Sequence, residues 1–503
     1  MKTINLIWYG AYGHHLSNII MTHRFFYVFM FLFTFSVSYA QIDKITKEEL
    51  LDAGLPVVEI TSVDEEWPTC EIVSGIPYGI NVTSIANANK VPGRLTISTK
   101  NAVLYDSGDY EKGKSGMTFK IRGNTSGKAD KKPYKIKLQK KADLLCRNNK
   151  IVESKDWVLI FDKNYYNKIG FKVNELMGLQ WTPAYEYVNV MINGKYQGLY
   201  MLLESVERDK DCRINVSKSG YIFEYDMYWW KEDLYVKIDT YLPWKMYYTF
   251  KYPEAEDMTD DQLAYFREMI TAVEASITNG TYPNYIDLNS FTSWMLAHDI
   301  LGTADGSGSN IYLTKYDNTD DSKVMMGNMW DFDSIFQITS DWSAVHTMFY
   351  FRYLFNMSNP NSAFIRAYRK QWERVSPTIF NDLNKYIDDF AQSEEAAALN
   401  ISAEWDNQLW GWTLKNHQID NLAILIKKFF NDRKSWLNRS ISSFPSCIKG
   451  DVNLDGKVNE KDLAALVAHI MGRDSDDIYG YDVDGNKVVN AVDIVELIKI
   501  IRK

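Results

Sequence analysis

Short segments in the first half of the chain alternate apolar and polar residues. Such alternation indicates strands with one buried face. It predicts strands at residues 55–61, 94–99, 117–122, 134–138, 187–192 and 196–203. Asn193 and Gly194 separate the last two segments, and this dipeptide is typical of a tight hairpin turn. With one helical stretch at residues 168–177, this half is predicted to be a sheet with a single helix.

The hydrophobic period changes beyond about Asp260. Apolar residues then recur at intervals of three and four, which indicates amphipathic helices. They are expected at residues 261–278, 288–301, 364–373 and 377–392. A strand-rich half followed by a helix-rich half predicts an α+β fold of two lobes, whose cleft would hold a ligand.

The length, charge and cysteine content of the chain limit the number of structural units and the kinds of partner that we expect. At 503 residues it is too long for one hydrophobic core, so about two to four structural units are expected. The net charge of −9 argues against a nucleic-acid partner bound through a general basic surface. Four cysteines, Cys70, Cys146, Cys212 and Cys447, show no Cys-x-x-Cys spacing, which argues against zinc. Their pairing stays open.

The N-terminal segment has the pattern of a secretory signal. A basic start after Met21 leads into the apolar run 25–37 and a small-residue end at Ala40. We therefore expect residues 1–40 to contain a signal peptide, with translation starting at Met21 and cleavage near Ala40. The mature protein would then be secreted or associated with the cell surface. No later segment approaches ~20 uninterrupted apolar residues, so no transmembrane anchor is expected.

The chemistry-bearing residues cluster in one stretch of the second half. Asp305 is followed five positions later by Asn310, and Trp330-Asp-Phe-Asp then supplies Asp331 and Asp333. Protein kinases use this spacing to provide a base for the acceptor hydroxyl and ligands for Mg²⁺. Phosphoryl transfer needs divalent cations, a positive side chain and a positioned base, and carboxylates with an amide suit Mg²⁺. The spacing favours phosphoryl transfer.

Six strings in chain order resemble the CotH kinase family, atypical protein kinases first associated with bacterial spore coats. The resemblance covers roughly residues 55–433. It implies a two-lobed, atypical protein-kinase-like fold with a strand-rich first lobe and a helical second lobe. The strings are Leu55-Pro-Val-Val, Arg122-Gly-Asn-Thr-Ser, Lys131-Lys-Pro-Tyr-Lys-Ile-Lys-Leu, Asn193-Gly-Lys-Tyr-Gln-Gly-Leu-Tyr-Met-Leu-Leu-Glu, Lys251-Tyr-Pro and Trp330-Asp-Phe-Asp.

The same resemblance implies a site that binds ATP with Mg²⁺ or Mn²⁺. It makes Asp305 the catalytic aspartate and Lys137 the strand lysine that steadies the phosphates, with Glu175 as its helix partner. The implied nucleotide-binding residues are Lys135, Lys137, Arg122 and Glu204, and the implied metal ligands are Asn310, Asp331 and Asp333. The chain departs from ordinary protein kinases, because no Gly-x-Gly-x-x-Gly loop precedes the lysine strand and no His-Arg precedes Asp305.

Two copies of a calcium-loop pattern lie near the C-terminus. Oxygen-bearing side chains occupy the first, third, fifth, ninth and twelfth positions, and each loop leads into an apolar helix, 463–471 or 494–501. This duplication resembles a type I dockerin, which implies two Ca²⁺ ions and a cohesin-type scaffold as partner. The implied ligands are Asp451, Asn453, Asp455, Asn459 and Asp462, and Asp482, Asp484, Asn486, Asn490 and Asp493.

These observations predict an order of domains. A signal peptide (1–40) precedes a strand-rich segment (41–110), a kinase-like domain (111–445) and a dockerin (449–503). The expected function is Mg²⁺-dependent transfer of the ATP γ-phosphoryl group to Ser or Thr of a protein. Two alternatives stay open: a catalytically silent kinase fold that serves as an adhesin or assembly component, and a component of a polysaccharide-degrading system that uses paired carboxylates.

Overall fold

The described residues of the computed structural model are 45–162, 164–305, 308–411, 418–445, 448–471, 481–486 and 488–503. The predicted signal peptide and Cys447 lie outside them. Cys70, Cys146 and Cys212, the described cysteines, are half-buried and form no disulfide with one another. Within the described residues, none of the helices combines the length and apolar character that crossing a lipid bilayer demands.

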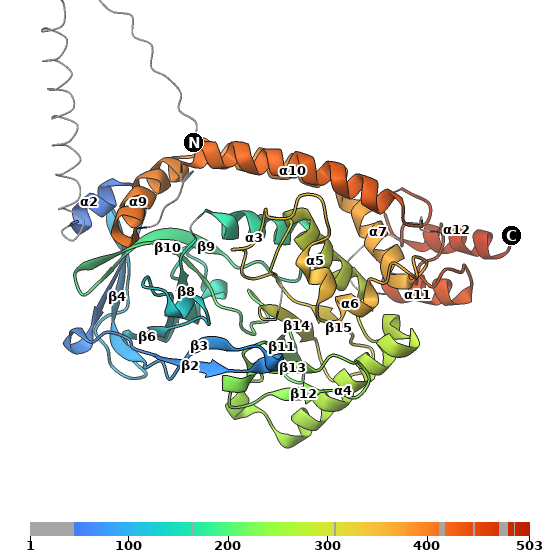
Figure 1. Cartoon of the computed structure of the whole chain (residues 1–503), viewed down its shortest axis with the longest axis horizontal. Coiled ribbons are helices and arrows are strands. Elements are labelled where there is room, and N and C mark those ends of the chain that lie inside the picture. The colour runs from blue at the N-terminus through green and yellow to red at the C-terminus, as the bar shows by residue number, and fades with distance from the viewer. Residues whose placement is uncertain are drawn as a thin grey trace, which may run out of the picture.

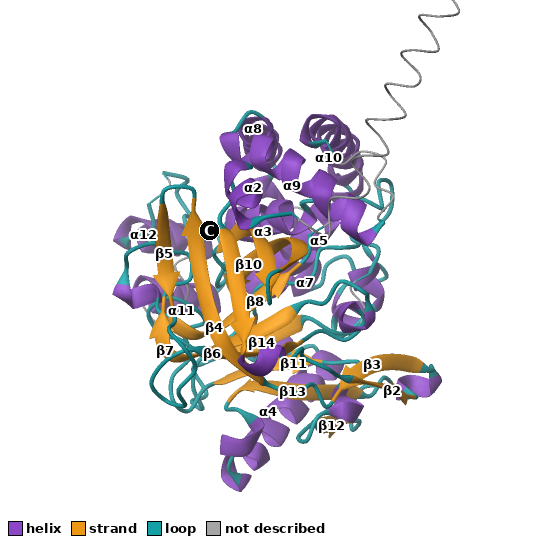
Figure 2. Cartoon of the chain, turned by 90° about the vertical axis from the view of Figure 1, so that its left-hand side faces the viewer, coloured by secondary structure: helices purple, strands orange, loops and turns teal. Residues whose placement is uncertain are grey.

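An eight-stranded sheet forms the first structural unit (Figures 1 and 2). Because β1 pairs with both β9 and β4, the sheet closes on itself and leaves β5 outside the ring. Alternate residues of its strands fill one apolar core that includes Val58, Ile136 and Val190. Its strands, in spatial order, are β1 (Val57–Ser62), β9 (Tyr185–Ile192), β10 (Lys195–Glu204), β8 (Ser154–Ile160), β7 (Tyr134–Ala142), β6 (Met117–Ile121), β4 (Val91–Thr99) and β5 (Ala102–Asp106).

The six strands predicted from alternation are all confirmed within this sheet. Asn193 and Gly194 connect β9 to β10 with φ angles of 49° and 70°, the left-handed conformation that a tight hairpin turn requires. The predicted helix is α3 (Tyr166–Leu176), and a short helix, α2 (Lys47–Asp52), precedes β1. Lys131 is buried and binds Asp406 of α9 (Glu394–Trp410) at 2.6 Å, which ties the sheet to the helices.

A second sheet, whose strands the alternation of apolar and polar residues did not predict, lies beside the first (Figure 1). Its order is β12 (Val236–Ile238), β13 (Met246–Tyr252), β11 (Tyr221–Tyr225), β14 (Ile311–Lys315) and β15 (Val324–Met326). β11 and β14 are buried at every residue, so their sequences show no alternation to reveal them. A small hairpin of β2 (Glu71–Gly75) and β3 (Val82–Ala86) completes the strands.

Helices predominate in the remainder of the chain, as the period predicted. The four predicted segments are α4 (Asp260–Asn279), α5 (Leu288–Leu301), α7 (Ala363–Val375) and α8 (Ile379–Ala391). The short α6 (Phe351–Leu354) and the long α10 (Ile419–Ser442) join them. α5 is buried from Phe291 to Leu301 and ends at Gly302, whose φ of 59° closes the helix. The chain beyond this cap carries Asp305.

The C-terminal module packs two short helices against each other. Leu466 of α11 (Glu460–Ile470) and Leu497 of α12 (Ala491–Ile501) form its centre. Both helices begin before the first apolar residue that marked them in the sequence, because Asn459 and Asn490 cap them with capping boxes. The module lies against α7 (Figure 1), where the Arg366 guanidinium hydrogen-bonds the Leu454 carbonyl oxygen.

Candidate active site

Four of the predicted site residues line one recess of about 230 Å³: Asp305, Asn310, Asp331 and Asp333. Asp305 and Asn310 come from the connection between α5 and β14, and the other two follow β15. The Ser334 hydroxyl fastens these connections together, since it accepts from Asp305 N at 3.1 Å and donates to Asp305 O at 3.0 Å. We call this hollow the acidic recess.

Two residues of the acidic recess hold a backbone conformation that glycine would favour. Asn310 has φ of 64° and Asp331 has φ of 69°. Asn310 Nδ2 donates to Asp331 Oδ2 at 3.1 Å, which joins the two connections by their side chains. Non-glycine residues in this conformation are uncommon and concentrate at functional sites. Both residues therefore carry backbone strain where their side chains meet.

The carboxylates of the acidic recess disfavour one another's charge. Desolvation by the surrounding protein, then repulsion from Asp333 and Asp305, raises the pKa of Asp331 to about 7, although Arg122 opposes the shift. Desolvation and Asp305 also raise the pKa of Asp333. A divalent cation would relieve this repulsion, and one amide with two carboxylates is a hard-oxygen donor set. Asn310, Asp331 and Asp333 therefore fit a Mg²⁺ or Mn²⁺ ion.

A second recess, of about 320 Å³, is lined by lysines from both sheets. Lys135 and Lys137 of β7 line it, together with Lys90 before β4, Lys120 of β6 and Lys251 of β13. Lys135 Nζ lies 2.8 Å from Asp156 Oδ1, and burial with repulsion from Lys135 lowers the pKa of Lys120. We call this hollow the basic recess. Lys137 thus lines the basic recess and not the acidic one.

Glu224 joins the two recesses. Its Oε2 lies 3.0 Å from Lys251 Nζ in the basic recess, and its Oε1 accepts from Asn310 N at 2.7 Å beside the acidic recess. Burial by itself would lower the pKa of Lys251, but Glu224 and Tyr312 more than offset this and raise it. The ammonium is therefore charged. One buried carboxylate separates the cationic wall from the candidate metal ligands.

Arg122 adds a second positive charge at this junction. Its guanidinium carbon lies 6.0 Å from the ring centroid of Trp330, the residue before Asp331. Desolvation lowers the pKa of Arg122, while Tyr312, Asp331 and Glu224 raise it. An arginine stays protonated under such conditions. Its charge is therefore shared between Asp331 and Glu224.

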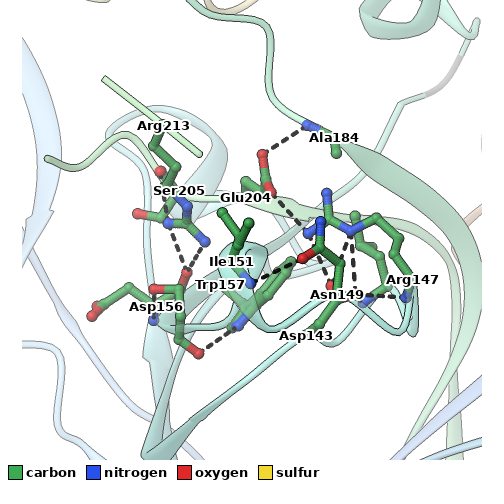
Figure 3. A network of polar contacts seen from close by, with 12 residues as sticks. Asp143, Arg147, Asn149, Ile151, Asp156, Trp157, Ala184, Glu204, Ser205 and Arg213 are labelled. Carbon is green, nitrogen blue, oxygen red and sulfur yellow. Dashed lines mark hydrogen bonds and ion pairs between the residues drawn. The ribbon is translucent and has the colours of Figure 1, made fainter. Parts of the chain in front are cut away.

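The Glu204 side chain is engaged in a structural network rather than directed at either recess (Figure 3). Glu204 is buried, with Oε1 2.9 Å from Arg147 Nη2 and Oε2 accepting from Ala184 N at 3.0 Å. The residues that follow it, Ser205 and Val206, line the basic recess. The residues directly after Glu204 thus line the basic recess, while the Glu204 carboxylate holds neighbouring segments together.

Glu175, the expected partner of Lys137, pairs elsewhere. Its Oε1 lies 2.7 Å from Lys172 Nζ on the same helix, and the pair is partly exposed. The pairing predicted for Lys137 is therefore not observed; the residue opposite Lys137 across β7 and β8 is Asp156.

In the C-terminal module, the two loops (residues 451–462 and 482–493) are closed by the aspartate at their twelfth position. Asp462 accepts from Asn453 N and Asn459 N, and Asp493 accepts from Val483 N and Asn490 N. Ligand atoms of Asp482, Asp484 and Asp493 all lie within 4.8 Å of one another. This second loop therefore fits a calcium ion. Within the described residues, the acidic side chains of the first loop form no such group.

The comparison with protein families decides the assignment. Residues 119–437, more than half of the chain, match the model of the CotH kinase protein family. The chain belongs to the CotH kinase family. Residues 449–502 of this CotH kinase protein match the dockerin type I domain, so the family and the module inferred from the sequence are both confirmed.

Other comparisons add little to this. A crystal structure of a Helicobacter pylori proinflammatory kinase, CtkA, is similar over 57% of this chain and 90% of that chain, with 10% sequence identity and a TM-score of 0.28. No curated protein matches the sequence.

Sequence reasoning missed two residues of this CotH kinase site. Lys251 belongs to the Lys-Tyr-Pro string that indicated the family, but no role was assigned to it. Glu224 lies in a fully buried strand, where an acidic residue is itself a signal, because a buried charge requires a partner. Its partners are distant in the sequence, and only the pairing of β11 with β13 and β14 brings them together.

Proposed function

We propose that this CotH kinase protein transfers the γ-phosphoryl group of ATP to a serine or threonine hydroxyl of a protein, with Mg²⁺ or Mn²⁺ bound. One observation carries the proposal: Glu224 joins a recess of carboxylates to a recess of lysines. A metal-bound triphosphate requires both lysines and carboxylates, since cations neutralise its oxygens and carboxylates hold its metal.

The residues of the acidic recess and the basic recess would have different roles. We assign Asn310, Asp331 and Asp333 as metal ligands and Asp305 as the group that accepts the acceptor's proton. When bound, the metal neutralises charge that develops on the β- and γ-phosphate oxygens. Lys135 and Lys137 remain candidate phosphate-binding residues. We add Lys251, which pairs with Glu224, and Arg122, which interacts with both Glu224 and Asp331.

The adenine base would lie in the basic recess. Ser205 and Val206 line this recess directly after Glu204, so Glu204 would lie near the nucleotide by its position in the chain and not through its side chain. Lys135 of the first sheet and Lys251 of the second face the same hollow. In this proposal the closed sheet acts as one lobe, and the second sheet with its helices acts as the other.

We further propose that the C-terminal module binds two Ca²⁺ ions and docks the protein onto a cohesin-type scaffold at the cell surface or outside the cell. The dockerin match and the carboxylate group of Asp482, Asp484 and Asp493 support this proposal. The segment before Gln41 would act as the export signal. A mature N-terminus near Gln41 on exported protein would support that part.

The test incubates purified protein with γ-labelled ATP, Mg²⁺ or Mn²⁺ and dephosphorylated casein. Wild-type protein is expected to label casein, and Asp305→Ala or Asp331→Asn should lower the rate at least about 100-fold. Asp321→Asn, an exposed aspartate in the connection between β14 and β15, is the control and should leave the rate unchanged. Protein that binds MgATP but labels neither casein nor itself would be a catalytically silent kinase fold, contrary to the proposal.

A further inference from the structure

Two side chains with buried ring nitrogens line the acidic recess and take no part in the roles assigned so far. Trp294 and His298 lie one helical turn apart on α5, and both line the recess. Their ring centroids are 4.1 Å apart. The side chains are only 1% and 4% exposed, yet neither Trp294 Nε1 nor His298 Nε2 has a hydrogen-bond partner in the described part of the chain.

The Nδ1 side of the His298 ring has a hydrogen-bond partner that fixes the ring. His298 Nδ1 lies 3.0 Å from Thr303 Oγ1, and Thr303 is itself buried beside the cap of α5. Burial lowers the pKa of His298 to about 3, so the ring is neutral at ordinary pH. Thr303 therefore sets the ring orientation and leaves Nε2 for a ligand, as a donor in one tautomer and an acceptor in the other.

The chemistry of the pair restricts what can satisfy it. An indole Nε1–H only donates, so the ligand must offer a lone pair to Trp294. Beside it, His298 Nε2 needs either a proton or a lone pair. A hydroxyl group supplies both, whichever tautomer His298 adopts. A phosphate oxygen can only accept, and the carboxylates of Asp305 and Asp333 in the same recess disfavour an anion that carries no metal.

We propose that Trp294 and His298 form the subsite that binds the hydroxyl of the phosphate acceptor. This inference rests on the proposed function and adds the acceptor side of the same site. The hydroxyl oxygen accepts from Trp294 Nε1 and, in the tautomer protonated at Nε2, also from His298, so its own proton is left for Asp305. Binding gives partners to two buried polar atoms that lack them in the free protein, and an alcohol is recognised in preference to groups without a proton to donate.

The experiment separates acceptor binding from nucleotide binding. Trp294→Phe keeps an aromatic ring and removes the N–H, and His298→Asn keeps an amide near Thr303 and removes the group at the Nε2 position. Each variant is expected to raise the KM for casein roughly tenfold, while the KM for ATP and the Kd for MgATP stay at the wild-type values. Trp372→Phe, which removes a buried indole on α7 outside the recess, should change none of these constants.

The outcomes distinguish this inference from the proposed function. Unchanged KM values for casein in folded Trp294→Phe protein would overturn the hydroxyl subsite and leave the kinase proposal standing. An equal rise in the KM for ATP and for casein would also overturn it, because the residues would then support the whole site. If wild-type protein fails to label casein or bind MgATP, the kinase proposal fails first. Should His298→Asn not fold, Trp294→Phe alone decides.

Discussion

The guanidinium of Arg366 on α7 donates two hydrogen bonds to the carbonyl oxygen of Leu454 in the first calcium-type loop, from Nε at 3.3 Å and Nη2 at 2.9 Å. The same group lies 3.8 Å from Asp451 Oδ2. A side chain at Gly456 would collide with it, since an added Cβ would lie 2.9 Å from Nη2. The kinase domain and the dockerin module are therefore in direct polar contact at the predicted calcium site.

Replacing Arg366 should loosen this contact. Arg366→Ala removes both hydrogen bonds and leaves the Leu454 carbonyl without its donor, a loss of about 1–2 kcal/mol. Limited proteolysis with trypsin should then cut after Lys449 roughly 5–30 times faster. Arg267→Ala, an exposed arginine on α4, serves as the control. Equal cutting rates in all three proteins would contradict a docked module.

Lys251 should contribute to ATP binding although it lies outside the lysine strand predicted from the sequence. Lys251→Met removes the cation that Glu224 holds at 3.0 Å and should raise the KM for ATP about tenfold or more. Glu224→Gln keeps an oxygen for Asn310 N but loses the ion pair, so a smaller rise is expected.

The control for that pair is Lys195→Met, an exposed lysine at the start of β10. It should leave the KM for ATP unchanged. A normal KM in Lys251→Met together with a raised KM in Lys137→Met would instead return the phosphate-binding role to the strand lysine predicted from the sequence.

Calcium removal should unfold the C-terminal module while the rest of the protein keeps its structure. Without a cation, the carboxylates of Asp482, Asp484 and Asp493 repel one another across less than 4.8 Å. With EGTA, hydrogen exchange of the full chain should rise at α11 and α12 and stay unchanged in the two large sheets. Asp493→Ala should show the same exchange at α12 in calcium as wild-type protein shows in EGTA. Exchange that does not respond to EGTA would mean that the module folds without calcium.

Glu274 should make the fold more stable at acidic pH than at alkaline pH. This carboxyl of α4 is fully buried, and among the described residues Oε1 accepts from the Tyr350 hydroxyl at 3.4 Å while Oε2 has no partner. Desolvation raises its pKa from 4.5 to about 7. The folded state therefore holds the proton more tightly, and this contribution is lost as pH rises from about 4.5 through about 7, at a cost of up to ~3 kcal/mol.

Chemical denaturation at pH 5 and pH 8.5 measures this effect. Glu274→Gln cannot ionise and should lose less stability than wild-type protein over that interval. Glu268→Gln, an exposed residue on the same helix, should follow the wild-type curve. If Glu274→Gln shows the same pH dependence as wild-type protein, the buried carboxyl is not the group that titrates.

The sequence by itself determined the features that depend on neighbouring positions along the chain. Alternation and the three-to-four period located the strands of the first sheet and the long helices, because one-sided burial repeats with the geometry of each element. The spacing of Asp305, Asn310 and Asp331 indicated the acidic recess, and the two loops indicated the dockerin, since those motifs are short and carry their ligands within one segment.

Only the tertiary structure decided which distant charges meet. Lys137 was predicted to steady the phosphates, and the structure places it in the basic recess, while Glu224 connects Lys251 of that recess to Asn310. β11 and β14 escaped the pattern because burial on both faces erases alternation. The contacts of Glu224 and Arg366 arise from packing between elements far apart in the chain, and periodicity along one element carries no information about its partners in space.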